Sequence, residues 1–248
     1  MTQPPARSPS TVVLALAGTA LLLLGAIGGW LFESSRISGS EQAAMREAVR
    51  TTLLEHPEIL PEAMEKLRER ETGKQVDALA DKLTTPFPGA VLGNPQGKVV
   101  LVEFTDFACT YCRASVAEVD ALIAANPDLK VVVREMPILS PQSAEAARMG
   151  LAAAEQGKYE NFYKAMFAAG RPDARTIAAA AQAAGLDMER ARKVIADPRT
   201  DAELAANLDY ARQLGFDGTP SWVIGDKAFS GAVGRDILQK AISEARES

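Results

Sequence analysis

The sequence has very few of the side chains that usually bind metal ions. Among its 248 residues there are two cysteines and one histidine, His56, which is far from both cysteines in the chain. A structural zinc site needs about four ligands, so these residues do not predict one. Basic clusters are also missing, and the net charge of −5 argues against a nucleic-acid partner. We expect no metal and no other non-protein cofactor.

Aromatic residues are scarce as well, at 6% of the chain, whereas alanine is abundant. This composition is typical of a helix-rich protein. The hydrophobic content of 47% is enough to fill a core, and the length allows one sizeable domain with appendages.

The only two cysteines lie close together, in Cys109-Thr110-Tyr111-Cys112. They follow the apolar run 99–102 and precede a segment with helical spacing, a context that indicates a redox dithiol of the thioredoxin kind. Free N–H groups at the start of a helix favour an anion, so we expect Cys109 to ionise readily and to attack a disulfide. Cys112, one turn later, would then release the mixed disulfide.

Three other interpretations of this cysteine pair compete: a structural disulfide, half of a zinc site, or two buried small apolar groups. A disulfide that closes so short a loop adds little stability, because the stabilising entropy grows with loop length. The strand–dithiol–helix context favours the redox interpretation.

The segment from Thr11 to Phe32 carries no charge and has about the length of a bilayer-spanning helix. Arg7 precedes it and Glu33 follows it, which places the N-terminus in the cytoplasm. We expect residues 1–33 to be a cytoplasmic tip and an inner-membrane anchor, with the rest of the chain facing the periplasm. A cleaved signal peptide, followed by secretion to the periplasm, is the alternative. Either way the dithiol meets an oxidising compartment.

Residues 34–85 are expected to form a helical spacer that begins with a short polar joint at 34–40. Two apolar stripes at helical spacing run through 41–83, interrupted at His56-Pro57-Glu58. The stripes consist of Met45, Val49 and Leu53, then Leu60, Met64 and Leu67. They need a partner surface, which is either the redox domain of the same chain or the same helices in a second copy, unless the segment is a solvated spacer. A homo-oligomer through 41–83 is therefore a hypothesis.

The redox domain is expected at 86–248, after the Pro/Gly-rich linker 84–89. The sequence of its first half predicts a strand at 98–104, the dithiol helix ending near Ala125, and a Val-rich strand at 129–135. This pattern predicts a βαβ unit with two parallel strands.

The second half begins with a helical pattern that fills about 140–216. Two short strands at 221–224 and 228–231 then flank a hairpin turn, and a helix at 235–245 closes the chain. The predicted order is βαβ, an all-helical insertion, and ββα, which makes an α/β protein.

Several motifs together resemble the DsbA-like thiol–disulfide oxidoreductases. They are the segment 102–108 before the dithiol, the helical insertion with Gln156-Gly157-Lys158-Tyr159, and Gly218-Thr219-Pro220-Ser221. The resemblance runs from about Val91 to the C-terminus, and it implies a thioredoxin fold with an all-helical insertion. The N-terminal region, with His56-Pro57-Glu58-Ile59, is similar to that of the ScsC-type proteins linked to copper tolerance.

This resemblance also implies roles for individual residues. Cys109 matches the nucleophile of the family and Cys112 its resolving cysteine. Thr219 and Pro220 resemble the cis-proline loop that offers backbone groups to a substrate, whereas an ordinary trans proline is the alternative. Glu103 resembles the buried acid that exchanges protons with Cys112, unless strand alternation points it to solvent.

The two residues between the cysteines depart from the pattern, because DsbA itself has proline and histidine there. The stabilisation that a histidine lends to the thiolate is missing, and Arg113 either replaces it in part or is a solvated helix residue. Tyr111 before the second cysteine and Thr219 before the proline look more like the disulfide isomerases. Tyr111 is also expected to contact the substrate.

We therefore expect an enzyme that exchanges disulfides of exported, cysteine-containing proteins, with an isomerase or reductase role favoured over an oxidase role. A membrane redox partner would recycle the dithiol. Two hypotheses of other classes stand beside it. One is a Cu(I)-binding module that uses both thiolates. The other is a chaperone with an apolar surface around Phe107, Tyr111 and Trp222.

Overall fold

The structure is a computed structural model that describes the backbone of residues 11–247, with side chains left undescribed at 11–15, 17 and 33–40. The predicted cytoplasmic tip, with Arg7, lies outside the described residues. The chain divides into two compact units with the boundary after Glu65.

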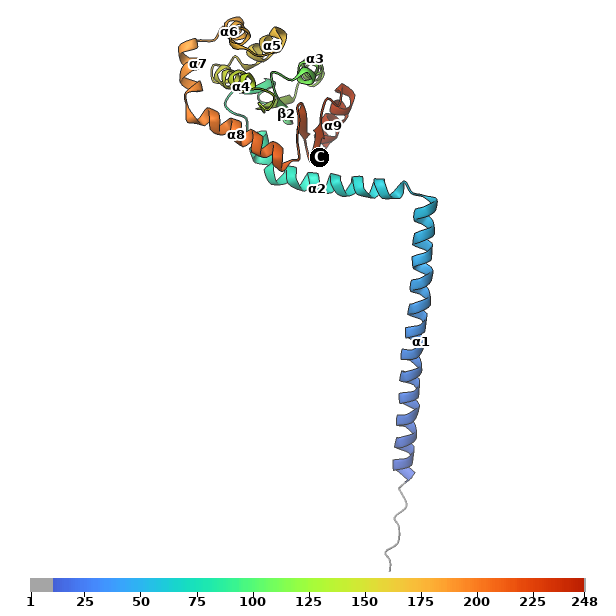
Figure 1. The fold of residues 1–248 in the computed structure, drawn as a ribbon. Helices are drawn as coiled ribbons and strands as arrows, with labels where there is room; N and C mark the ends of the chain where they lie inside the picture. Colours follow the sequence, from blue (N-terminus) through green and yellow to red (C-terminus); the bar gives the residue numbers. More distant parts are fainter. Residues whose placement is uncertain (1–10, 248) are drawn as a thin grey trace, which may run out of the picture. The chain divides into compact units, whose positions relative to one another are not determined.

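The main element of the first unit is the long helix α1 (Thr11–Glu55) (Figure 1). The expected polar joint at 34–40 is part of this helix, because no proline there removes a backbone N–H. Within the part of the chain that the structure describes, no helix is both long enough and apolar enough to cross a membrane. The predicted anchor over 11–32 is therefore not supported. Its uncharged residues form only the first part of α1.

Helix α2 (Ile59–Thr84) follows a turn at His56-Pro57-Glu58, which confirms the predicted interruption of the helical region. In that turn the Nδ1 atom of His56 lies 3.1 Å from Glu58 Oε1, and both side chains are exposed. Helix α2 continues without a break to Thr84. Its apolar residues Val76, Leu79 and Leu83 are buried within the second unit.

A five-stranded mixed sheet forms the centre of the second unit, in the order β1-β3-β2-β4-β5. Its strands are β1 (Val91–Gly93), β2 (Val99–Thr105), β3 (Leu129–Glu135), β4 (Ser221–Ile224) and β5 (Lys227–Ser230). The pair β2 and β3 is parallel, as predicted, and the other neighbours are antiparallel. Strand β1 was not predicted, because three residues are too few to show an alternating pattern.

Helix α3 (Thr110–Ala125) carries the dithiol and ends where the sequence predicts, before Asn126-Pro127. The predicted helical insertion contains five helices in the described residues. They are α4 (Pro141–Ala154), α5 (Tyr159–Ala169), α6 (Ala174–Ala183), α7 (Met188–Ile195) and α8 (Pro198–Gln213). Ser140, Asp173, Asp187 and Asp197 cap four of them with side-chain oxygens that accept backbone N–H bonds. Helix α9 (Arg235–Glu247) closes the fold.

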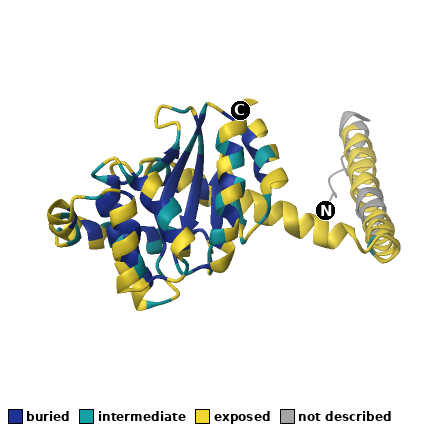
Figure 2. Ribbon diagram, turned by 90° about the horizontal axis from the view of Figure 1, so that it is seen from above, coloured by how far each residue is buried: buried dark blue, intermediate teal, exposed yellow. Residues whose placement is uncertain are grey.

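Alternate residues of the strands build two cores on the two faces of the sheet. On one face, Leu101, Val131 and Trp222 belong to a cluster with residues of α3, α4, α5 and α9. On the other face, Val102 and Phe104 pack in a cluster with Val76, Leu79 and Leu83 of α2 and with residues of α8. Figure 2 shows the strands buried between these layers, while the first part of α2 is exposed. The last turns of α2 are thus part of the redox domain.

Arg134 of β3 holds the end of α2 in place. Its side chain is buried, donates to Glu203 Oε1 at 2.7 Å, and donates to the main-chain oxygens of Lys82, Leu83 and Thr85. The last carbonyl groups of a helix have no partners within the helix, so Arg134 provides them. The Pro/Gly-rich linker at 84–89 therefore starts from a fixed point.

Replacing Leu79 with alanine tests whether α2 belongs to this core. We expect Leu79→Ala to lower the free energy of unfolding by about 2–5 kcal/mol, because a buried leucine leaves a cavity. Ile237→Ala, at an exposed position of α9, should change it by less than about 0.5 kcal/mol. Urea denaturation of the full chain, followed by the fluorescence of buried Trp222, measures both. Equal losses in the two variants would contradict the core role of Leu79.

Candidate active site

Cys109 occupies the N-cap position of α3, directly after the three residues that follow β2. Its backbone is extended, with φ −76° and ψ 122°, and its sulfur accepts a hydrogen bond from the backbone N–H of Cys112 at 3.1 Å. Both cysteines are free thiols. A negative charge on the Cys109 sulfur is favoured here, because the N–H groups and the positive end of the helix dipole face it.

The two thiols have opposite tendencies to ionise. A hydrogen bond from the Cys112 thiol, and to a smaller extent from backbone N–H groups, lowers the pKa of Cys109 to about 6. Burial, and then the same hydrogen bond, raise the pKa of Cys112 far above its ordinary value. These opposite shifts favour a thiolate at Cys109 and a thiol at Cys112 near neutral pH.

The loop before β4 brings Thr219 and Pro220 to the dithiol. Strand β4 pairs with β2, with Ser221 opposite Phe104, so the residues just before β4 lie beside the end of β2. The peptide bond between Thr219 and Pro220 is cis, as the sequence indicated. When Cys109 is protonated, its thiol donates to the carbonyl oxygen of Thr219 at 3.2 Å.

An open cleft of about 660 Å³ leads to Cys109. It is lined by residues from four segments, among them Tyr111, Ile138, Leu139, Arg171 and Thr219. The Tyr111 side chain is 69% exposed, and Ile138 and Leu139 are also exposed. Sequence reasoning found Tyr111 and Thr219 but missed the others, which lie far from the dithiol in the chain. Cys109 itself is only 4% exposed, and it lies in the wall of this cleft.

Glu103 lies inside the domain, on the face of β2 that is covered by the insertion. It is fully buried, which excludes the solvent-facing alternative, and the hydroxyl group of Tyr163 lies 3.0 and 3.1 Å from its two carboxylate oxygens. Burial raises the pKa of Glu103 to about 7, although the Tyr163 hydrogen bond opposes this. The carboxyl group is thus able to gain or lose a proton near neutral pH.

A second buried acid, Glu135, lies close to Glu103 and was not found from the sequence. Glu135 pairs with Thr105 across β2 and β3, so it faces the same side of the sheet as Glu103. Tyr159 donates to it at 2.6 Å. Burial, and then the charges of Asp106 and Glu103, raise the pKa of Glu135 well above its usual range. Burial therefore favours the neutral form of this carboxyl group.

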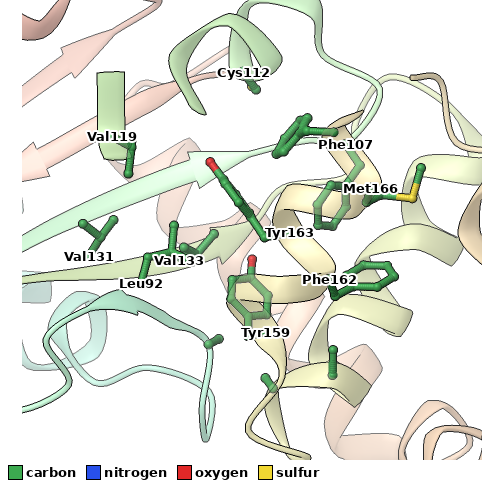
Figure 3. Packing of buried hydrophobic residues seen from close by; sticks show 14 of the residues in the cluster. Leu92, Phe107, Cys112, Val119, Val131, Val133, Tyr159, Phe162, Tyr163 and Met166 are labelled. Carbon is green, nitrogen blue, oxygen red and sulfur yellow. The ribbon is translucent and has the colours of Figure 1, made fainter. Parts of the chain in front are cut away.

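Tyr159 and Tyr163 are one helical turn apart on α5, and Figure 3 shows them side by side among the buried residues near Cys112. Their rings are 6.0 Å apart between centroids. The spacing of four residues in the sequence is the signal that could have indicated a shared polar function, because such residues lie on one helix face. Burial, and then the charge of Glu103, raise the pKa of Tyr163 well above its usual range, and Cys112 adds a smaller contribution. Tyr163 therefore lies near both Glu103 and Cys112.

Arg113 does not compensate for the missing histidine. Its Nε atom donates to the carbonyl oxygen of Phe167, at the end of α5, at 3.0 Å. The side chain thus ties the dithiol helix to the insertion, and it is neither a solvated helix residue nor a partner of the Cys109 thiolate.

Comparison with known proteins agrees with this geometry. Residues 100–243 match the family described as DSBA-like thioredoxin domain, and residues 41–72 match the Copper resistance protein ScsC N-terminal domain. The thioredoxin match covers more than half of the chain.

Two solved structures illustrate the similarity. A thioredoxin-like oxidoreductase from Silicibacter pomeroyi DSS-3 is 41% identical, with a TM-score of 0.64, over 68% of this chain and 98% of that one. A linker-deletion mutant of Proteus mirabilis ScsC is 27% identical, with a TM-score of 0.66, over 83% of this chain and 95% of that one.

Among curated proteins, the Na(+)/H(+) antiporter NhaA 1 of Salinispora arenicola is 27% identical over 158 residues, which is 62% of this chain. The chain spans about a quarter of the length of the curated relatives it matches, 24% in this case. We draw nothing about ion transport from so partial a match.

Replacing Glu103 with glutamine tests the burial of the carboxyl group. The pKa is raised from 4.5 to about 7, so the unfolded chain loses this proton first and the folded state loses stability as pH rises between these values. Relative to the wild type, reduced Glu103→Gln should gain about 3 kcal/mol of unfolding free energy between pH 4.5 and 7.5. Urea denaturation at several pH values measures this gain.

The control is Gln182→Ala, which removes no titratable group, at an exposed position of α6. Its stability difference from the wild type should not vary with pH. If the stability difference between Glu103→Gln and the wild type were also independent of pH, the Glu103 carboxyl group would titrate as in water.

Proposed function

Because this chain belongs to the family of DSBA-like thioredoxin domains, we propose that it exchanges disulfide bonds in exported, cysteine-containing proteins through Cys109. It is a thiol–disulfide oxidoreductase of the DsbA and ScsC type. The observation that carries the proposal is the placement of the two sulfurs. Cys109 lies at the N-cap of α3 and lines an open cleft, where the N–H of Cys112 donates to its sulfur and favours a thiolate, whereas Cys112 is fully buried.

The first step is attack of the Cys109 thiolate on one sulfur of a substrate disulfide. A new S–S bond forms between Cys109 and the substrate, and the other substrate sulfur leaves as a thiolate. The cis-proline loop and Tyr111 flank the reacting sulfur, so we assign Thr219, Pro220 and Tyr111 to substrate binding. The carbonyl group of Thr219 points at Cys109 and is available as an acceptor for a substrate strand.

The mixed disulfide has two outcomes. In isomerisation, a substrate thiolate attacks the substrate sulfur, forms a new disulfide within the substrate and restores the Cys109 thiolate, with no net transfer of electrons. In reduction, Cys112 attacks the Cys109 sulfur and the substrate leaves as a thiolate. Two electrons then pass from the dithiol to the substrate, and the enzyme becomes oxidised.

Glu103 is the proposed base for the second outcome. Cys112 must lose its proton to attack, and burial makes this costly. Glu103, with a pKa of about 7, accepts that proton in the direction of substrate reduction and returns it to Cys112 when the disulfide is reduced again. Tyr163 holds the carboxylate by hydrogen bonds to both oxygens.

We favour an isomerase or reductase over an oxidase because of the N-terminal helices. Apolar residues stay exposed on α1 and on the first half of α2, at Met45, Val49, Leu54, Leu60, Met64 and Leu67. They fall in or near the segment that matches the ScsC N-terminal domain, and we propose that they join copies of the chain. Oligomers shield a reduced dithiol from a membrane oxidase, and an isomerase needs that protection.

The proposed compartment is the periplasm, where disulfides persist and exported proteins fold. A membrane redox partner would return electrons to the dithiol there. Binding of Cu(I) is the alternative of another class, since two thiolates are soft ligands. The buried Cys112 resists ionisation, so thiol exchange fits the pair better than a two-thiolate metal site does.

Reactivation of scrambled ribonuclease A by the reduced full chain tests this function. We expect the wild type to restore ribonuclease activity and Cys109→Ser to restore none. Cys112→Ser should retain part of the activity and accumulate mixed disulfides, because isomerisation needs only Cys109.

Two results would contradict the proposal. Exchange that survives Cys109→Ser would show that the assigned nucleophile is wrong. Failure with scrambled ribonuclease, together with rapid disulfide formation in reduced ribonuclease by the oxidised chain, would identify an oxidase.

A further inference from the structure

Asp106 is a buried carboxylate between the end of β2 and the dithiol. It is 1% exposed, and its bonds go to backbone N–H groups on two separate segments. One oxygen accepts from Ala108 at 2.7 Å, and the other accepts from Ile138 at 2.9 Å and from Leu139 at 3.0 Å. Its own carbonyl oxygen accepts from the N–H of Cys109 at 2.9 Å. One residue thus connects the turn before the nucleophile to the segment after β3.

The sequence explains why a side chain is needed at this point. The parallel ladder of β2 and β3 ends with a bond from the N–H of Met136 to the carbonyl oxygen of Thr105 at 2.8 Å. Pro137 follows and has no N–H to continue the ladder. The next two donors, on Ile138 and Leu139, are the ones that Asp106 accepts. Asp106 therefore extends the connection between the two chain segments beyond the end of the sheet.

Ile138 and Leu139 form an apolar lip on the cleft that leads to Cys109. Their side chains are 40% and 53% exposed, although their backbone is fixed by Asp106. Thr110 and Tyr111, directly after Cys109, line the same cleft. Fixed apolar groups at the mouth of a cleft bind a partner without the entropy cost of ordering a loop.

We propose that Asp106 is a positioning residue that sets the distance and orientation between this lip and the Cys109 sulfur, and so determines how tightly protein substrates bind. This inference rests on the proposed function. The occupant of the lip is an extended, apolar segment of the substrate next to the cysteine that is attacked. Asp106 touches neither the substrate nor the reacting sulfur.

A carboxylate is required because it accepts on both of its oxygens, whereas an amide has one oxygen and one NH₂ group. In Asp106→Asn the NH₂ group would face the N–H of Ala108 or those of the lip. One of the two connections would then be lost while the size of the side chain is kept. The variant thus separates the link between segments from the packing of the residue.

The test is the reduction of insulin by the full chain, with a small dithiol as the terminal reductant. We expect Asp106→Asn to raise KM about tenfold, the effect of one ordinary hydrogen bond, and to lower kcat much less. Alkylation of Cys109 by iodoacetamide should keep the pH midpoint of the wild type, because the reagent is too small to need the lip. Asp236→Asn, on the exposed surface of α9, is the matched control with unchanged KM.

Leu139→Ala provides a second variant that keeps the backbone N–H bound by Asp106. We expect it to raise KM by itself. In its background Asp106→Asn should raise KM by less than about threefold, since the two changes act through the same lip. This variant changes an exposed side chain, so it tests the lip even if Asp106→Asn does not fold.

The inference would be overturned if Asp106→Asn raised KM by the same factor in the wild type and in Leu139→Ala. A KM that Leu139→Ala leaves unchanged would also overturn it. A parallel fall of alkylation and insulin reduction in Asp106→Asn would also overturn it, because Asp106 would then act on Cys109 itself. If the wild type does not reduce insulin at all, the proposed function fails first and the inference fails with it.

Discussion

The hydrogen bonding of the Cys109 sulfur at the first turn of α3 is the interaction on which the rest of the site depends. The sulfur meets the N–H of Cys112 at 3.1 Å and the carbonyl oxygen of Thr219 at 3.2 Å. The first contact requires the strand-to-helix turn, and the second requires β4 to lie beside β2. The central strands thus serve to bring two loops, 110 residues apart, to one sulfur atom.

The hydrogen bond between the two thiols and the deeper burial of Cys112 make them chemically different. The helical insertion adds to that difference. An exposed Cys112 would ionise as easily as an ordinary thiol, and both sulfurs would compete for substrates. Because Cys112 is buried, it needs a base inside the protein. Helix α5 places Tyr163 against Glu103, and its neighbour Tyr159 against Glu135. The insertion therefore does more than cover the sheet, since its two tyrosines contact both buried acids, and we propose Glu103 as the group that exchanges a proton with Cys112.

The sequence was sufficient to predict those helices and strands that are determined by the local spacing of apolar residues and by prolines. The strands 99–105 and 129–135 and the dithiol helix were predicted within a residue or two, because their periodicity and Asn126-Pro127 define them. Tertiary relations were not predictable in this way. Three such relations join segments that are distant in the chain. They are the Glu135–Tyr159 hydrogen bond, the hydrogen bonds of Asp106, and the packing of α2 through Leu79. The predicted membrane helix rested on the length of one uncharged segment and on the charges that flank it, and the described residues do not support it.

The ionisation of the dithiol is the most direct test of this account. The measurement is the ultraviolet absorbance of thiolates in the reduced full chain as a function of pH, with each thiolate counted. We predict that one thiolate forms with a midpoint near pH 6 and that the second does not form in the range where the protein stays folded. Two thiolates that form together near pH 8.5, as in an unperturbed thiol, would contradict the account.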